Sequence, residues 1–180
     1  ESIMNLKTGL KAFLGFAQNN YGMLRCPDLP SEIDHQIIGH SHQGKDILCY
    51  KVGTGSYPIL FLSAIHGNEV GTVRFAHHLL SWLIDPPEIQ RGFSCFVIPC
   101  LNPDGYDLAR RQPDYRHGGR IGRLNARDVD LNRNFDTASF QSEAAWHHGA
   151  EYSLKTPVFA GTHAGSEPET QALVSLIKKE

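Results

Sequence analysis

The sequence lacks an excess of charge of one sign, and it lacks long hydrophobic runs. Its 17 basic and 19 acidic residues are interspersed and give a net charge of −2, so no basic face indicates a nucleic-acid partner. The longest apolar stretches, such as YPILFLSAI, are too short to cross a bilayer. The first twenty residues also lack the basic start and continuous apolar core of a signal peptide. We therefore expect neither a nucleic acid nor a membrane among the partners.

Cysteine is scarce, and its spacing forms no metal-binding or redox motif. The four cysteines contain no C-x-x-C pair, and two of them lie in strand-like apolar runs. These residues are Cys26, Cys49, Cys95 and Cys100. We expect buried free thiols rather than disulfides or metal ligands. Free thiols favour a reducing compartment, so a cytoplasmic location is predicted, with a periplasmic or secreted one left open.

The composition is typical of one soluble globular domain over residues 1–180. The chain is 41% hydrophobic and 20% charged, which is enough for a sizeable core. Two β-rich stretches, 33–53 and 58–65, are separated by a short turn segment and are expected to be neighbouring strands. The apolar stretch 93–102 predicts a strand buried inside a sheet. Strands that alternate with helices indicate an α/β layered fold.

Three helices are predicted from the spacing of apolar residues. The first covers about the first twenty residues, and the second runs from residue 68 or 69 to about residue 85. The third begins in the segment SEPET, with Ser166 as N-cap and Glu169 completing a capping box. Between Pro103 and about Thr162 the periodicity fades, and an irregular stretch of that length is usually functional.

A histidine and a glutamate stand three positions apart where a predicted strand gives way to a helix. His66 and Glu69 supply the nitrogen and oxygen donors that zinc accepts. This spacing can direct both side chains at one cation. The alternative is structural, with Glu69 capping the helix beside a hydrogen-bonded His66.

Four short segments follow one another in a specific order. They are HGNE (66–69), NPDGY (102–106), RLNARDVDLNRNF (123–135) and SEPET (166–170). Together with GHSHQGKDI (39–47), they resemble the zinc carboxypeptidases of the family typified by pancreatic carboxypeptidase A, and within it the bacterial murein peptide amidases. The resemblance runs from about Ile38 to the last residue. It implies an α/β fold with a mixed, mostly parallel sheet and helices on both faces, similar to phosphorylase/hydrolase-like folds.

The resemblance also implies a role for five side chains. His66 and Glu69 match two zinc ligands. Arg123 matches the arginine that stabilises the oxyanion of the tetrahedral intermediate, and a fixed positive charge suits that role. Asn132 and Arg133 match the pair that binds the terminal carboxylate of the substrate, for which a planar guanidinium fork is well suited. We interpret Pro103, Asp104 and Gly105 as a turn rather than as part of the chemistry.

Each arginine has an alternative interpretation. Arg133 could form a surface ion pair with Asp128, Asp130 or Asp136. The other arginines around Arg123 are expected to be solvated loop charges; they are Arg110, Arg111, Arg116, Arg120 and Arg127. Among the histidines outside the motif, only His163 is kept as a spare metal ligand.

The sequence departs from the family after the last helix. The family places its second zinc-binding histidine and its general-base glutamate beyond that helix, whereas this chain ends at Glu180. We expect an N-terminal portion of a longer catalytic domain, inactive alone and prone to self-association through an exposed sheet edge. The alternative is an incomplete relative that binds peptides without cleaving them.

The predicted function is zinc-dependent hydrolysis of an amide bond next to a C-terminal residue. The substrate would be a peptide or murein peptide with a free terminal carboxylate, and the cofactor would be Zn²⁺. One alternative is an N-acyl amino acid deacylase similar to aspartoacylase and succinylglutamate desuccinylase, which share HGNE and an Asp-Leu-Asn-Arg stretch. The other is a non-catalytic module that binds the peptide carboxylate.

Overall fold

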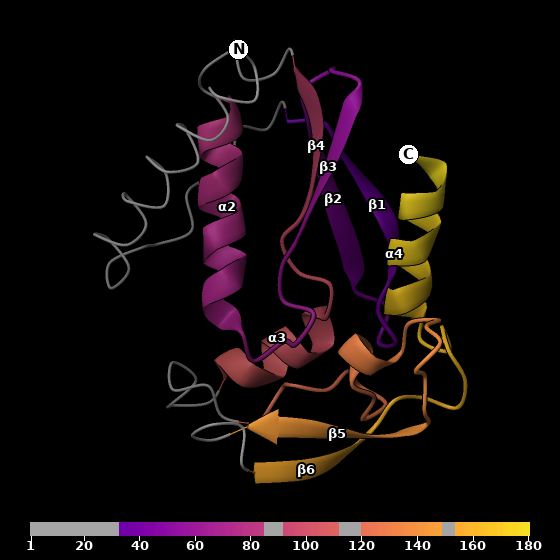
Figure 1. Ribbon diagram of the computed structural model, residues 1–180. Helices are drawn as coiled ribbons and strands as arrows, with labels where there is room; N and C mark the ends of the chain where they lie inside the picture. The colour runs from indigo at the N-terminus through magenta and orange to yellow at the C-terminus, as the bar shows by residue number, and fades with distance from the viewer. Residues whose placement is uncertain (1–32, 85–91, 112–119, 149–153) are drawn as a thin grey trace. The chain divides into compact units, whose positions relative to one another are not determined.

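The computed structural model describes residues 33–84, 92–111, 120–148 and 154–180 (Figure 1). The predicted first helix, Cys26 and Arg116 lie outside these residues. The strands are β1 (His35–His40), β2 (Asp46–Val52), β3 (Tyr57–Leu62), β4 (Phe93–Ile98), β5 (Glu143–His148) and β6 (Leu154–Phe159). The helices are α2 (Val70–Ile84), α3 (Pro103–Arg110), the 3₁₀ helix η3 (Leu131–Arg133) and α4 (Pro168–Lys179).

Four strands form a mixed sheet in the order β1-β2-β4-β3. β4 pairs antiparallel with β2 and parallel with β3, and all six of its residues are buried, as its apolar run predicts. The prediction that 33–53 and 58–65 are neighbouring strands is wrong, because β4 lies between β2 and β3. β3 exposes Tyr57 and contains Pro58, which cannot donate to a ladder, and both residues suit an edge position.

The chain forms two compact units. Of the described residues, the first comprises 33–36 and those within Leu48–Ser63 and Gly71–Pro99, and α2 lies alongside its strands in Figure 1. α2 begins and ends within two residues of the prediction. Its inner face and the strands share one apolar core of Val52, Ala76, Leu79, Leu80, Leu83, Phe93, Cys95 and Val97.

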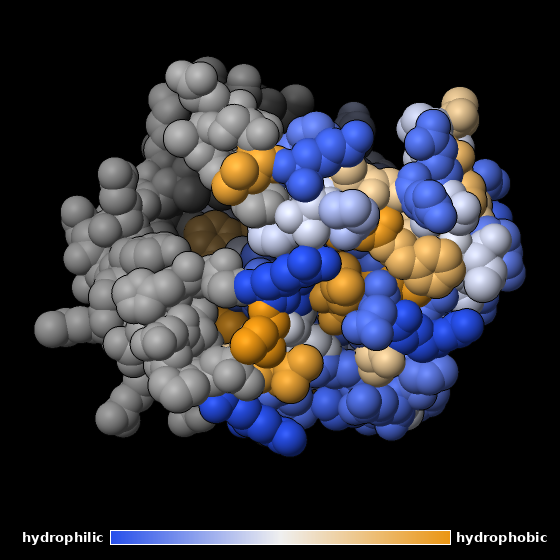
Figure 2. Space-filling view, turned by 90° about the horizontal axis from the view of Figure 1, so that it is seen from below, coloured by the Kyte–Doolittle hydropathy of each residue, from blue (hydrophilic) through white to orange (hydrophobic). Residues whose placement is uncertain are grey.

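The second unit comprises Ile37–Ile47, Ala64–Val70 and Cys100–Glu180. It contains α3, η3, α4 and the antiparallel hairpin of β5 and β6. The expectation of irregular structure from Pro103 to Thr162 is therefore wrong in part. Figure 2 shows the molecule from the side on which this hairpin lies, with apolar side chains set among hydrophilic ones; Leu154 and Phe159 of β6 are exposed.

The starts of α3 and α4 differ from the predictions. Pro103, Asp104 and Gly105 form no separate turn, since Pro103 opens α3 and the Asn102 side chain caps it by accepting from Gly105 N at 2.9 Å. The prediction of a capping box at α4 is also wrong. Glu167 is the N-cap residue and makes no side-chain cap. Glu169 is fully buried and bonded to other segments.

The cysteines that the structure describes are free thiols, and Cys49 and Cys95 are buried, as predicted. Burial raises the pKa of Cys95 to about 11, which makes it an inert core residue. None of the described helices combines the length and hydropathy that a membrane span requires.

Candidate functional site

A tightly constrained loop between β3 and α2 carries His66 and Glu69. Ala64 adopts a left-handed conformation with φ of 45°, and its carbonyl accepts from Asn102 N at 3.0 Å. Gly67 lies against the start of α3 so closely that a Cβ would be 2.1 Å from Tyr106 N. Only glycine fits there, because backbone atoms cannot move aside for a side chain.

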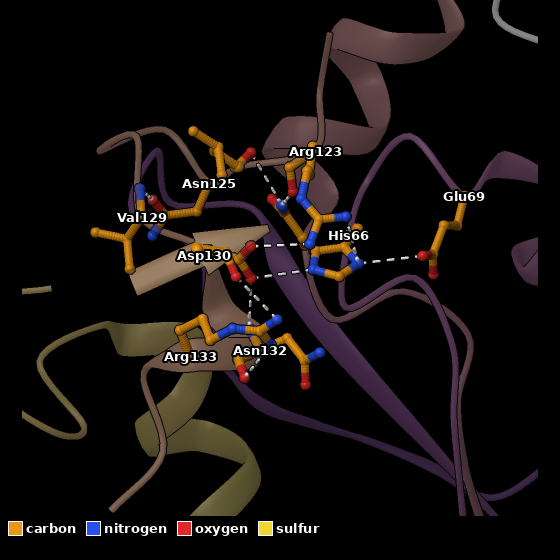
Figure 3. Close-up of polar contacts among 11 residues, drawn as sticks. His66, Glu69, Arg123, Asn125, Val129, Asp130, Asn132 and Arg133 are labelled. Atoms are coloured by element: carbon orange, nitrogen blue, oxygen red, sulfur yellow. Dashed lines mark hydrogen bonds and ion pairs between the residues drawn. The ribbon is translucent and has the colours of Figure 1, made fainter. Parts of the chain in front are cut away.

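The imidazole of His66 lies between two carboxylates, as Figure 3 shows. Its Nε2 is 3.0 Å from Asp130 Oδ1, and its Nδ1 is 3.1 Å from Glu69 Oε1. Asp130 is fully buried, whereas the Glu69 side chain is 45% exposed. One side of the ring is therefore fixed inside the protein, while the other side, with Glu69, can be reached from solvent.

Asp130 is the functional residue that sequence reasoning missed. Besides His66, its carboxylate accepts from Arg123 Nη2 at 2.9 Å and from Asn132 N at 3.1 Å. Burial raises the pKa of Asp130, but the hydrogen bond from His66 and the charge of Arg123 outweigh it and hold the pKa below its usual range. The sequence alone indicates Asp130 only as one possible ion-pair partner of Arg133. The requirement that a metal-binding histidine be held by an acceptor on its other nitrogen was the available signal.

The same contacts act on His66. Burial lowers its pKa, and the hydrogen bonds with Asp130 and Glu69 more than compensate, so that the pKa is raised above its usual value. An imidazole held this way has its Nε2 committed to Asp130. Its Nδ1 is the nitrogen that faces Glu69.

Arg123 is the buried arginine of its loop. It is 6% exposed, and its Nη1 lies 3.4 Å from His66 Nδ1. The other described arginines around it, Arg110, Arg111, Arg120 and Arg127, are exposed. The expectation of solvated loop charges is wrong for Arg127, whose Nη1 lies 3.7 Å from Oε1 of the buried Glu167. The structure therefore brings Arg123 together with His66 and Asp130, and leaves its neighbours outside.

Arg133 and Asn132 lie on the other side of Asp130 in Figure 3. Arg133 donates to the carbonyls of Asn132 at 3.3 Å and Ala145 at 3.4 Å. No carboxylate of the described residues forms an ion pair with it, and Asp130 pairs with Arg123 instead. Arg133 and Asn132 also line a cavity of about 450 Å³. The charge of Arg133 is thus not neutralised by the protein residues described.

A second buried network shapes the loop that precedes Asp130. Asn125 Oδ1 accepts from the backbone of Arg127 and Val129, both at 3.0 Å. Its Nδ2 donates to Glu167 Oε2 at 2.8 Å and to Glu169 Oε2 at 3.2 Å. One amide therefore ties this loop to the start of α4.

The donors at His66 and Glu69 fit a zinc ion as two of its ligands. Nitrogen and carboxylate oxygen are zinc donors, they lie close to each other, and Asp130 supplies the acceptor that orients such a histidine. In the parts of the chain that the structure describes, no three His, Cys, Asp or Glu side chains gather as a metal site. His163, kept as a spare ligand, is exposed and bonded to Thr162, so it does not complete the pair.

The chain is similar to known proteins over most of its length. A family model described as zinc carboxypeptidase matches residues 25–180. Carboxypeptidase Z of Rattus norvegicus is 31% identical over 155 residues, covering 72% of this chain and 23% of that protein. Murein peptide amidase A of Escherichia coli K12 is 35% identical over 123 residues, covering 67% of this chain and 43% of that protein.

A solved structure is similar over most of the described fold. The murein-tripeptide amidase MpaA of Escherichia coli O157 superposes with a TM-score of 0.62 at 29% identity, covering 84% of this chain and 57% of that one. The chain spans less than half the length of the curated relatives reported above.

Proposed function

Because the chain belongs to the zinc carboxypeptidase family, we propose that the protein carrying it uses zinc to hydrolyse the amide bond next to a C-terminal residue. One observation carries the proposal. His66 Nδ1 and Glu69 Oε1 lie 3.1 Å apart, and Asp130 holds the opposite ring nitrogen at 3.0 Å. A structural histidine would not need a carboxylate on each side, one of them open to solvent.

Each side chain at or near this pair has a separate proposed role. His66 and Glu69 would hold the zinc, which when bound polarises a carbonyl and lowers the pKa of water. Arg123 would donate hydrogen bonds to the developing oxyanion, and its burial would strengthen such bonds. Arg133 and Asn132 would bind the terminal carboxylate of the substrate; the lack of a carboxylate partner for Arg133 among the described residues supports this role.

Murein peptides are the substrate class to test first. The similarity to murein peptide amidase A in both sequence and structure supports this choice over peptides in general. A panel of murein tripeptides, ordinary peptides and N-acyl amino acids, tested on the complete protein, separates these classes. Cleavage of N-acyl amino acids alone would replace the proposal with a deacylase.

Zinc content tests the metal site directly. We expect the His66→Ala, Glu69→Ala double variant of the complete protein to lose its zinc, because two donors are removed together. Elemental analysis of the purified protein measures this. His163→Ala is the matched control, since this exposed histidine lies outside the site. Full zinc occupancy in the double variant would contradict the proposal.

Substrates with free and amidated termini test Arg133. Arg133→Ala should lower kcat/KM for the free acid roughly a hundredfold, or about 3 kcal/mol, because a charged group loses its partner. The amidated substrate should be cleaved poorly by the wild type and be nearly indifferent to the change. Arg120→Ala, at an exposed arginine of the loop that carries Arg123, should leave both rates unchanged. Additive losses would show that Arg133 does not touch the carboxylate.

A further inference from the structure

The hairpin of β5 and β6 places an aromatic ring on the buried arginine. The half-buried Trp146 in β5 lies over the guanidinium of Arg123, with 4.4 Å from Cζ to the ring centroid. The adjacent residue, Ala145, accepts a hydrogen bond from Arg133. Two neighbouring residues of one strand therefore contact both arginines of the candidate site.

The hydrogen bonds of Arg123 leave its orientation incompletely fixed. Nη2 is bonded to Asp130 at 2.9 Å, and Nη1 is 3.4 Å from His66 Nδ1. Nε is buried and has no hydrogen-bond partner among the residues that the structure describes. These contacts hold the two terminal nitrogens of the Arg123 guanidinium. They do not prevent the guanidinium plane from tilting about those nitrogens.

An aromatic ring over the guanidinium supplies the missing constraint. A guanidinium is attracted to the face of an aromatic ring, and this attraction is stronger where water is excluded. The indole also shields one face of the group, which strengthens the hydrogen bonds of the other atoms. Asp130 then fixes one edge of the Arg123 guanidinium, and Trp146 fixes the tilt of its plane.

We propose that Trp146 is a positioning residue that holds the guanidinium plane of Arg123 in the orientation that an oxyanion requires. This inference rests on the proposed hydrolysis, since the oxyanion forms only in that reaction. It assigns to the hairpin a role in transition-state binding. Substrate binding through Arg133 should depend on the backbone of Ala145 and not on the indole.

Kinetics on the complete enzyme separate positioning from packing. Trp146→Leu should lower kcat about tenfold with KM changed by less than about twofold, because the oxyanion exists only in the transition state. Trp146→Phe, which keeps an aromatic face, should retain most of kcat. In an Arg123→Ala background, Trp146→Leu should cost nothing further, since its effect acts through that arginine. Equal loss in both backgrounds, or a loss confined to KM, would overturn the proposal.

A second measurement needs neither activity nor metal. In the complete protein labelled with fluorotryptophan, the Trp146 resonance is assigned by its absence from Trp146→Phe. Arg123→Met should shift this resonance, because the charge over the ring is lost. Arg120→Met, at an exposed arginine of the same loop, should leave it in place. An unmoved resonance would overturn the contact itself.

The two measurements distinguish the two failures. An enzyme that hydrolyses amides but shows no shift refutes the positioning role and leaves the proposed function standing. A protein with the shift and no amide hydrolysis on the whole substrate panel refutes the proposed function, and the catalytic role of Trp146 with it.

Discussion

The interiors of the two units are built from different kinds of side chain. The core of the first consists of apolar residues such as Leu80 and Val97. Every buried charged side chain of the described residues lies in the second unit; these are Asp104, Arg123, Asp130, Glu167 and Glu169, together with the ionisable His66. The candidate site belongs entirely to the unit with the polar interior.

Because of this difference, the two interiors are held together by different kinds of interaction. Apolar contacts are non-directional, so the first core depends mainly on volume and shape. A buried charge needs partners with correct geometry, and one lost partner leaves another group unpaired in a medium that cannot solvate it. The second interior is therefore more sensitive to single changes, and it specifies the orientation of its side chains.

The largest expected effect comes from removing the central carboxylate. Asp130→Ala should lower the free energy of unfolding of the complete protein by about 3–5 kcal/mol, because Arg123 and His66 lose their shared acceptor. Asp130→Asn, which keeps the shape, should cost less. Urea denaturation measures both. A loss below about 1 kcal/mol for Asp130→Ala would mean that the interior can rearrange, and the contrast between the units would fail.

An apolar substitution in the first unit should cost somewhat less. Leu80 is fully buried in its core, so Leu80→Ala should lower the free energy of unfolding by about 2–5 kcal/mol through lost contacts and a cavity. Leu80→Met, of similar volume, should cost less than about 1.5 kcal/mol. The Met variant should also leave the zinc content unchanged, because Leu80 lies in the apolar core and outside the candidate site. If Leu80→Met cost as much as Leu80→Ala, the first core would not tolerate a change that conserves volume, and the contrast between the units would fail.

The smallest expected effect is a pH dependence of stability that arises from a buried carboxyl group in the second unit. Burial, and then the nearby charge of Glu167, raise the pKa of Glu169 above its usual value despite hydrogen bonds from His42 N and Asn125. The folded state thus favours the protonated acid. This contribution to stability is full below the ordinary carboxyl pKa and is lost as the pH rises through the raised pKa.

Glu169→Gln should remove that dependence, because an amide does not titrate. Relative to the wild type, the urea midpoint of the variant should therefore rise from acidic to neutral pH. Glu143→Gln, at an exposed glutamate of β5, is the control and should follow the wild-type curve. Parallel curves for wild type and Glu169→Gln would contradict the raised pKa.

The sequence predicted the parts of the fold that depend on regular apolar spacing. α2 and the buried strand β4 lie where their patterns indicate, and His66 with Glu69 stands at the junction that the motif predicted. The order of strands was not readable, because local patterns do not report which strand pairs with which. The prediction of Glu169 as a helix cap is wrong for the same reason. Its hydrogen-bond partners, His42 and Asn125, are 127 and 44 positions away in the sequence.

Trp146 and Asp130 could not have been found from spacing either. Each acts through a residue of another segment, and nothing in the local sequence of β5 indicates Arg123 as its neighbour. The role of Asp130 required the distance to His66 Nε2. Directional polar contacts between distant segments produce no periodic pattern in the sequence, whereas amphipathic helices and buried strands produce a recognisable pattern of apolar residues.

The hydrogen bond between His66 and Asp130 also determines when, during synthesis on the ribosome, the His66 ring can be oriented. It joins positions 64 residues apart, so at the usual pace of about 5–20 residues per second the ribosome makes His66 about 3 to 13 seconds before Asp130. All of α2 and β4 are synthesised in that interval. The imidazole therefore emerges long before the carboxylate that fixes its ring. A nascent chain carries an unoriented histidine, and the geometry of this proposed metal ligand is acquired only when the loop ending at Asp130 arrives.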